Sequence, residues 1–198
     1  MSFGNIPSNK ELTSEIAKTL QANNMKDGVH IRLTLTRGKK ITSGMDPRLN
    51  QDGNTLIVLA EFKSPVYDTS GLSLATSSIR RFTPDTLDPK IHSCNLIQSI
   101  MAKIEANAAG ADDALMLDSN GFIAETNATH LFFVKDEIVF TSRAIACPEG
   151  VTRQVVIDLC KQNNIELIVK DCSQAELYRA DECFCTGTMG ELASVTKV

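Results

Sequence analysis

The sequence predicts an α+β fold with either two layers or a barrel-like sheet. Three features support this class: an amphipathic segment at residues 8–24, two β-like segments soon after it, and a row of short strands between residues 114 and 141 joined by tight turns. Strands that follow one another directly, mixed with separate helices, are typical of α+β proteins and not of strictly alternating α/β folds.

The first region of the chain is expected to hold one helix and two strands. Ser8 is suited to cap a helix over residues 8–24, and Glu11 stands where it closes a capping box. Residues 29–38 alternate apolar and polar side chains, which predicts a strand. Residues 54–62 are apolar almost throughout, which predicts a second strand in the middle of a sheet.

A second region is expected after a linker at residues 64–71, so the predicted domains are residues 1–63 and 72–198. Its helix at residues 94–110 has Leu96, Ile100, Ala102 or Ile104, and Ala106 on the side expected to be buried. The other expected elements are strands over 72–82, 114–118, 122–126, 131–135, 137–141, 165–172 and 182–188, the last being the final strand, and helices over 152–164 and 174–181.

Composition and charge exclude several classes of function. The 198 residues carry a formal net charge of −4 and no basic block, so nucleic-acid binding is not expected, and Arg80-Arg81 is interpreted as a solvated pair. No apolar run spans a bilayer and the first residues do not form a signal peptide, so we expect no membrane association and a cytoplasmic location. The six cysteines form no C-x-x-C pair, so no metal site is expected.

Lys90 and Glu125 are the first two candidates for chemistry. Lys90 lies in a loop before the helix at residues 94–110. Most lysines in such loops are simply solvated, whereas an amine kept from water is a nucleophile that forms Schiff bases. Glu125 follows three apolar residues in a predicted strand. A structural cation partner is the simplest explanation of such a carboxylate, but it can also hold the cationic ring nitrogen of a cofactor.

Two glycine-containing turns are candidate anion sites. Gly150 allows a tight turn before a helix, and Thr152 is suited to cap that helix. The free N–H groups of a helix N-terminus bind anions, although most such ends are merely capped. The strand at residues 182–188 ends in Thr186-Gly187-Thr188, whose hydroxyls and N–H groups suit a phosphate or carboxylate, although the same residues also make ordinary turns.

These four features together match the needs of pyridoxal 5′-phosphate. A lysine forms the Schiff base, a carboxylate keeps the pyridine nitrogen protonated, and two turns hold the phosphate. The run KIEANAAGADDALMLDSNGFIAETNATHLFFVKDEIVFT, followed by GVTR and ADECFCTGTMGEL, resembles the fold-type IV pyridoxal-phosphate aminotransferases. The branched-chain and D-amino-acid aminotransferase-like proteins are the most similar members, and the resemblance covers nearly the whole chain from residue 30.

The resemblance implies a large domain with a barrel-like sheet and helices, together with the C-terminal part of a small α/β domain. It implies a homodimeric transaminase that moves an amino group between an amino acid, of the branched-chain or D-amino-acid class, and a 2-oxo acid. The residue roles that it implies are these: Lys90 as the Schiff-base lysine and proton shuttle, Glu125 as the partner of the pyridine nitrogen, Val151, Thr152 and Thr188 as phosphate ligands, Met189 as a backbone contact to the substrate carboxylate, and Arg32 or Arg37 as the carboxylate-binding arginine.

The chain also departs from the family pattern. Compared with the family it starts late and stops early, so a chain truncated at both ends is expected. His130 stands where asparagine is usual, and Ser194 where proline is usual. Glu149 adds a carboxylate beside the expected phosphate site, where it would repel a phosphate.

Two classes of function therefore stay open from the sequence. The first is an enzyme, either a transaminase or a lyase of the same fold that resembles aminodeoxychorismate lyase. The second is a truncated, non-catalytic paralogue or isoform that associates with full-length subunits. Visible absorbance after incubation with pyridoxal phosphate, compared with that of Lys90→Ala, separates the two classes.

Overall fold

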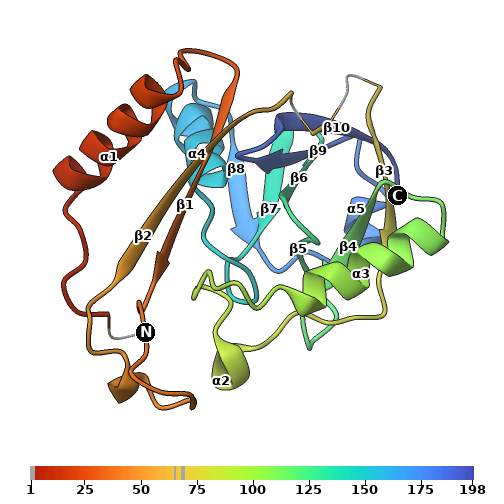
Figure 1. Ribbon diagram of the computed structural model, residues 1–198. Coiled ribbons are helices and arrows are strands. Elements are labelled where there is room, and N and C mark those ends of the chain that lie inside the picture. The colour runs from red at the N-terminus through yellow and green to blue at the C-terminus, as the bar shows by residue number, and fades with distance from the viewer. Residues whose placement is uncertain (1–2, 65, 68–69) are drawn as a thin grey trace. The chain divides into compact units, whose positions relative to one another are not determined.

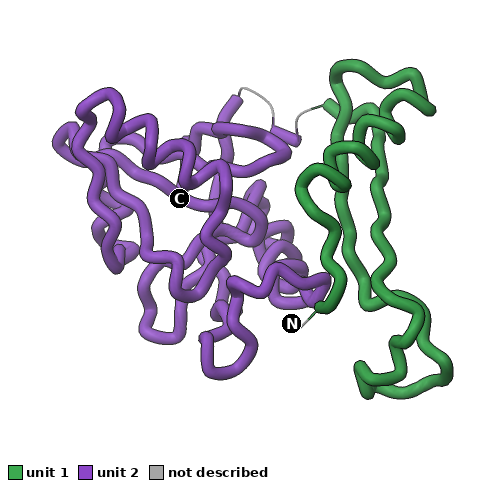
Figure 2. The backbone as a smooth tube through the Cα atoms, turned by 90° about the vertical axis from the view of Figure 1, so that its left-hand side faces the viewer, with its two compact units in different colours: residues 1–64 green, residues 65–198 purple. Residues whose placement is uncertain are grey.

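The structure is a computed structural model that describes residues 3–64, 66–67 and 70–198. Its contacts divide the chain into two compact units, residues 1–64 and residues 65–198, which Figure 2 colours separately. Among the helices that the structure describes, none has both the length and the apolar character that a membrane crossing requires.

The first unit consists of one helix and a β-hairpin. Helix α1 (Asn9–Ala22) starts with the expected capping box, in which the Ser8 hydroxyl accepts from the Glu11 N–H and the Glu11 carboxylate accepts from the Ser8 N–H. Strands β1 (Val29–Thr36) and β2 (Thr55–Phe62) pair antiparallel, and the short 3-10 helix η1 (Pro47–Leu49) lies in the loop between them.

The central position expected for the strand at residues 54–62 is wrong. In the described part of the chain, β2 pairs only with β1, in a two-stranded sheet. Ile57 and Leu59 are 49% and 47% exposed. An apolar run marks a strand, but the number of partners that the strand has is decided by other segments.

The second unit is built on one eight-stranded mixed sheet (Figure 1). Its strand order is β5-β4-β3-β10-β9-β6-β7-β8. The strands are β3 (Leu72–Thr76), β4 (Asp113–Leu117), β5 (Ile123–Thr126), β6 (His130–Lys135), β7 (Ile138–Ser142), β8 (Leu167–Lys170), β9 (Glu182–Gly187) and β10 (Glu191–Lys197). The helices are α2 (Pro84–Leu87), α3 (Ile97–Ala108), α4 (Val151–Gln162) and α5 (Gln174–Leu177).

The sheet curls because of one short connection. Strand β5 is at one edge of the sheet, yet it is followed almost at once by β6, which lies between β9 and β7. The connection is closed by hydrogen bonds from the N–H of Thr126 to the carbonyl of Thr129 and between their hydroxyls, at 2.8 Å and 2.7 Å. An edge strand tied this tightly to an inner strand bends the sheet into a half-barrel, which agrees with the barrel-like sheet expected from the sequence.

Two expectations about this unit are wrong. The strand at residues 182–188 is not the final one, because β10 follows and pairs with both β9 and β3. In helix α3 only Ala102 and Ala106 are buried, whereas Ile100 and Ile104 are 53% and 60% exposed. The two alanines pack on Ala114 and Met116 of β4, where small side chains let the helix lie close to the sheet. Leu96, also expected to be buried, is 45% exposed.

Candidate functional site

Glu125 is a buried carboxylate held by an arginine. It lies near the end of β5, is 4% exposed, and its Oε1 is 2.7 Å from Nη2 of Arg81. Burial raises the pKa of Glu125 to about 7, although the charge of Arg81 acts to lower this pKa. A carboxylate whose pKa is this strongly raised is common at functional sites and easily exchanges a proton near neutral pH.

Arg81 is fixed by groups on two other elements. Its Nη1 donates to the hydroxyl of Ser99 on α3 at 3.0 Å, and its Nη2 donates to the carbonyl of Thr126 at 2.8 Å. The Nε–H of Arg81 is buried without a hydrogen-bond partner among the described residues. The interpretation of Arg80-Arg81 as a solvated pair is therefore wrong for Arg81. A buried glutamate signals that a cation is near, but nothing in the local sequence says which one.

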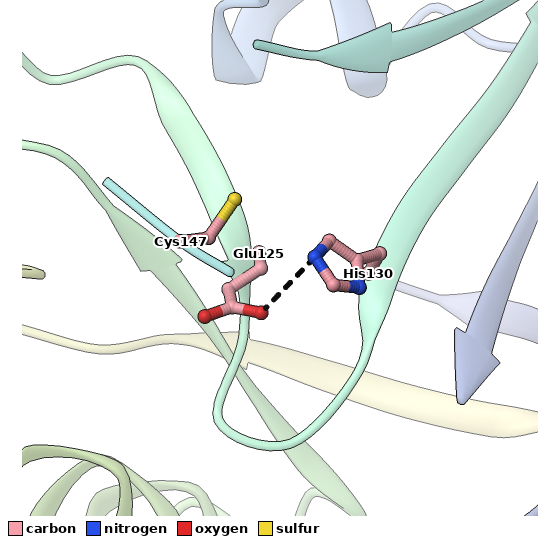
Figure 3. A group of neighbouring side chains, drawn as sticks. All are labelled: Glu125, His130 and Cys147. Carbon is pink, nitrogen blue, oxygen red and sulfur yellow. Dashed lines mark ion pairs between the residues drawn. The ribbon is translucent and has the colours of Figure 1, made fainter. Parts of the chain in front are cut away.

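His130 lies next to the Glu125 carboxylate, as Figure 3 shows, beside the oxygen that does not pair with Arg81. Its Nε2 is 3.7 Å from Oε2 of Glu125 and 2.7 Å from the carbonyl oxygen of Pro148. Burial and the charges of Arg153 and Arg81 lower the pKa of His130, against the opposing effect of the Pro148 hydrogen bond. The imidazole is therefore neutral at pH 7, and because a carbonyl only accepts, its proton is on Nε2.

Cys147 completes a group of three possible metal ligands with Glu125 and His130, whose ligand atoms all lie within 4.8 Å of one another. Burial and the neighbouring Glu125 raise the pKa of Cys147 to about 12, so it is a protonated thiol. The ion pair with Arg81 and the hydrogen bond to Pro148 already engage the other two residues. Glu125 and His130 therefore have partners within the protein.

A pocket of about 250 Å³ opens beside Glu125 and Arg81. One wall is formed by the end of β5, the residues just after it and Pro148 in the turn before α4. The other wall is formed by the loop that leads into α3. Glu125 is thus at once buried and at the edge of a space that a small molecule can enter. The lining residues outside this carboxylate and arginine include Leu87, Pro89, Ile91, Asn95, Leu96, Asn127, Ala128 and Pro148.

Lys90 lies in the loop wall of this pocket, between two of its lining residues, but its own side chain is exposed and is not part of the lining. Its N–H donates to the carboxylate of Asp88 at 3.0 Å. The charge of Lys90 acts to lower the pKa of Cys147, so the amine lies within electrostatic reach of the buried cluster. The described residues do not supply the desolvation that a nucleophilic lysine needs.

Helix α4 presents an open N-terminus. Gly150 is its N-cap residue, with φ of 74°, and no side chain caps the helix. The expectation that Thr152 caps it is wrong, because the helix already begins at Val151 and Thr152 lies in the first turn. Val151 is 82% exposed. The first N–H groups of α4 are therefore available to an anion.

The turn between β9 and β10 carries Thr188 and Met189. Thr188 is exposed, and the carbonyl of Met189 accepts a hydrogen bond from the N–H of Val66 at 3.3 Å. Strand β9 leads into this turn, and a Cβ added at Gly187 would lie 3.0 Å from Cγ2 of Thr129. The turn thus starts against the segment that joins Glu125 to His130.

His130 brings these parts together, a role that its sequence position did not reveal. Its backbone pairs with Thr186 of β9, and its ring lies against the backbone of Gly150. Glu125, the start of α4 and the end of β9 are therefore assembled around one imidazole. The sequence expectation that Glu125, Val151, Thr152 and Thr188 belong to one site stays a prediction, and this arrangement supports it.

The two candidate arginines belong to the first unit. Arg32 is exposed on β1, and Arg37, just after β1, has its guanidinium carbon 4.8 Å from the centre of the Phe3 ring. Their assignment to a substrate carboxylate stays a prediction.

Comparison with known proteins decides the family. The model of the family "Amino-transferase class IV" matches residues 3–198. This chain belongs to the class IV aminotransferase family. It is 50% identical over 199 residues to "Branched-chain-amino-acid aminotransferase-like protein 2" of Arabidopsis thaliana, covering all of this chain and 36% of that protein. It is 37% identical to a putative branched-chain-amino-acid aminotransferase of Methanocaldococcus jannaschii, covering 96% of this chain and 65% of the relative.

Solved structures of class IV aminotransferases share the fold of this chain. The branched-chain amino acid aminotransferase of Thermoproteus uzoniensis with norvaline has a TM-score of 0.87 at 28% identity, over 96% of this chain and 64% of that one. The Escherichia coli branched-chain enzyme has a TM-score of 0.90 at 28% identity, over 99% and 66%. A putative 4-amino-4-deoxychorismate lyase from Legionella pneumophila has a TM-score of 0.89 at 22% identity, which shows the fold alone. The chain spans less than two thirds of the length of most of these proteins.

Proposed function

We propose that this chain forms the cofactor-binding part of a pyridoxal 5′-phosphate-dependent aminotransferase. Membership of the class IV family supports the reaction class. The observation that carries the proposal is the buried Glu125, paired with Arg81 at the edge of a pocket and joined through His130 to the open end of α4. The Glu125 carboxylate and the anion site at the start of α4 are held in fixed positions relative to each other. This arrangement suits a molecule with a cationic group at one end and a phosphate group at the other.

The residues present fit this cofactor. Glu125 would hold a proton on the pyridine nitrogen, the N–H groups of Val151 and Thr152 would bind the phosphate together with the Thr152 and Thr188 hydroxyls, and Lys90 would hold the cofactor aldehyde. The buried Nε–H of Arg81, which lacks a partner among the described residues, leaves a donor beside Glu125 for a ligand to use. Bound pyridoxal phosphate supplies an electron sink for the bonds at the substrate α-carbon.

The chain's own residues would then control the protons. Glu125, paired with Arg81 on one oxygen, keeps a negative charge more easily once a cationic ring nitrogen lies beside it. Lys90 stands at the rim of the pocket, where its amine would take a proton from one substrate atom and return it to another. The apolar lining residues Leu87, Ile91 and Leu96 would exclude water from the pocket.

We propose amino acids of the branched-chain class, with 2-oxo acids as acceptors, as the substrates. The relatives named above carry branched-chain names, which supports this class over D-amino acids. The Legionella lyase shares the fold, so a lyase reaction stays a candidate until substrates are compared. Arg32 or Arg37 and the N–H of Met189 are proposed to meet the substrate carboxylate.

We also propose that the protein works as a homodimer in the cytoplasm. Helix α3 carries four apolar residues on its open side, which supports a protein partner there. They are Ile97, Ile100, Met101 and Ile104, each between 47% and 60% exposed. A non-catalytic chain that associates with longer subunits would use the same surface, and cofactor binding separates the two cases.

Peptide mapping tests the role of Lys90. The protein is incubated with pyridoxal phosphate, reduced with borohydride and digested, and the modified lysine is found by mass spectrometry. We expect the pyridoxyl group on Lys90, and we expect the visible absorbance band to be lost in Lys90→Ala but kept in the surface variant Lys26→Ala. A label on another lysine would disprove the assignment, and no label at all would favour the non-catalytic chain.

A further inference from the structure

We propose that His130 is a positioning residue that holds the turn before α4 at a fixed distance from the Glu125 carboxylate. The inference rests on the proposed function, because the two groups that His130 joins are the ones assigned to the two ends of the cofactor. His130 itself is not assigned a contact with cofactor or substrate. It acts through the turn formed by Pro148, Glu149 and Gly150.

The first contact is the hydrogen bond from His130 to the turn. Nε2 lies 2.7 Å from the carbonyl oxygen of Pro148, a strong donor–acceptor distance. The side chain is only 12% exposed, so water competes little for this bond. The carbonyl of Pro148 precedes the N-cap residue of α4 by two positions, so the bond fixes the chain just where it turns into the helix.

The second contact is steric. A Cβ added at Gly150 would lie 2.4 Å from Cε1 of His130 and 2.7 Å from Nδ1. The imidazole therefore lies directly on the Gly150 backbone, in space that any other residue at position 150 would need. Gly150 also has φ of +74°, which other residues adopt only with strain. Glycine at this position is thus explained by both the ring and the backbone.

The third contact joins the histidine to the acid and to β9. Nε2 is 3.7 Å from Oε2 of Glu125. This distance is too long for a hydrogen bond, but it brings the two side chains into contact, so each limits the position of the other. The backbone of His130 pairs with Thr186, two residues before Thr188. One residue therefore contacts the acid, the start of α4 and the strand that leads to the second candidate anion site, the turn with Thr188.

The size of the side chain is essential to this role. An asparagine, the residue expected here from the family resemblance, also carries an N–H donor. Its amide nitrogen, however, lies nearer to the backbone than Nε2 of histidine, so it would fall short of the Pro148 carbonyl and leave the space beside Gly150 empty. Glutamine is longer and places its amide closer to the position of Nε2, so it is the conservative replacement.

The test compares His130→Ala, His130→Asn and His130→Gln with a control, Val156→Ala, which removes a buried side chain of α4 away from the cluster. Two quantities are measured: the dissociation constant of pyridoxal phosphate, and hydrogen exchange of the Gln154 N–H in the protein without cofactor. That N–H bonds to the carbonyl of Gly150 at 3.0 Å and reports on the first turn of α4.

We expect His130→Ala to weaken pyridoxal phosphate binding by about tenfold, the lower end of the loss found when groups that orient metal ligands are removed. We expect Gln154 exchange to become about three- to tenfold faster, as for the loss of one hydrogen bond. His130→Asn should behave like the alanine variant, and His130→Gln should recover part of both effects. Val156→Ala should lower the thermal stability of the protein. It should change the affinity for pyridoxal phosphate by less than about twofold. Any rise in exchange should be no larger in the first turn of α4 than in the rest of the helix.

Unchanged Gln154 exchange in His130→Ala would overturn the proposal, and so would exchange in His130→Ala that rises no more at Gln154 than along the rest of α4. If His130→Ala does not fold, His130→Asn and His130→Gln provide the same comparison. If the wild-type protein does not bind pyridoxal phosphate, the proposed function fails, while the exchange measurement still decides whether His130 positions the turn.

Discussion

At the residue scale, the main titratable group of the candidate site is the carboxylate of Glu125, whose pKa is subject to two opposing effects. Burial favours the neutral acid at Glu125, and the guanidinium of Arg81 favours the anion. The result is a group whose pKa of about 7 makes it titrate near neutral pH in the protein without cofactor. Burial lowers the pKa of Arg153, and the charge of the exposed Glu149 acts against this lowering. The carboxylate expected to repel a phosphate therefore has a cation within electrostatic reach.

The raised pKa of Glu125 predicts a pH-dependent stability. The ordinary pKa of the group is 4.5 and its pKa in the folded protein is about 7, so the folded state keeps a proton that the unfolded chain loses. The free energy of unfolding should therefore fall as the pH rises from about 4.5 to about 7, by on the order of 3 kcal/mol. Glu125→Gln, which does not ionise, should lack this component.

Urea unfolding of wild type and Glu125→Gln across this pH range, without cofactor, measures the difference. A constant difference between the two proteins would show that Arg81 keeps the acid ionised throughout. The matched control is Glu137→Gln, the same change at an exposed turn, which should shift the stability curve little at any pH.

At the element scale, helix α3 shows how packing distance selects side chains. Its sheet-facing side consists of Ala102 and Ala106, which are 0% and 1% exposed. Ala114, opposite them on β4, is also fully buried. The helix lies so close to the sheet that large residues fit only on its outer side. Hydrophobicity alone would have placed the isoleucines inside.

This packing predicts different effects for two substitutions on the same helix. Ala102→Leu adds volume to a filled interface and should lower the free energy of unfolding by about 1–3 kcal/mol. Ile104→Gln, on the outer side of the helix, should change it by less than about 0.5 kcal/mol in the monomer. Thermal or urea unfolding of both variants measures this. Equal losses in the two would mean that Ile104 is buried in solution.

At the scale of the whole molecule, the outer side of α3 is the feature that points beyond a single chain. Exposed apolar residues on a monomer are usually scattered singly over its surface, whereas four of them lie next to one another on this helix face. Ser99 of the same helix accepts a hydrogen bond from Arg81, so the position of the helix is tied to the candidate site. A partner on this face would therefore bind close to the pocket.

We expect the paired change Ile100→Glu and Ile104→Glu to convert a dimer into a monomer of 21.6 kDa. Two charges desolvated at a contact are far more costly than two charges left in water. Light scattering during size-exclusion chromatography gives the mass directly. Leu159→Glu, on an equally open position of α4, serves as the matched control. A mass that stays the same in the paired variant would place the contact elsewhere or show that the wild type is monomeric.

The sequence by itself determined the elements that depend on neighbours along the chain. The capping box of Ser8 and Glu11, strand β1 and the short strands from β4 to β7 follow from side-chain spacing and turn chemistry, and the structure has them all. Glu125 is also conspicuous in the sequence, because a carboxylate that follows three apolar residues is costly to bury.

Only the tertiary structure decided what surrounds that carboxylate. Arg81 became its partner because Arg81 follows β3, and β3 and β5 both pair with β4. His130 met Gly150 because β6 pairs with β7, the strand that precedes the turn before α4. Local spacing carries no information about which cation or which turn arrives there. The same reason explains the misplaced buried side of α3 and the unexpected β10: burial and strand pairing depend on the whole sheet, whereas sequence patterns report on one segment at a time.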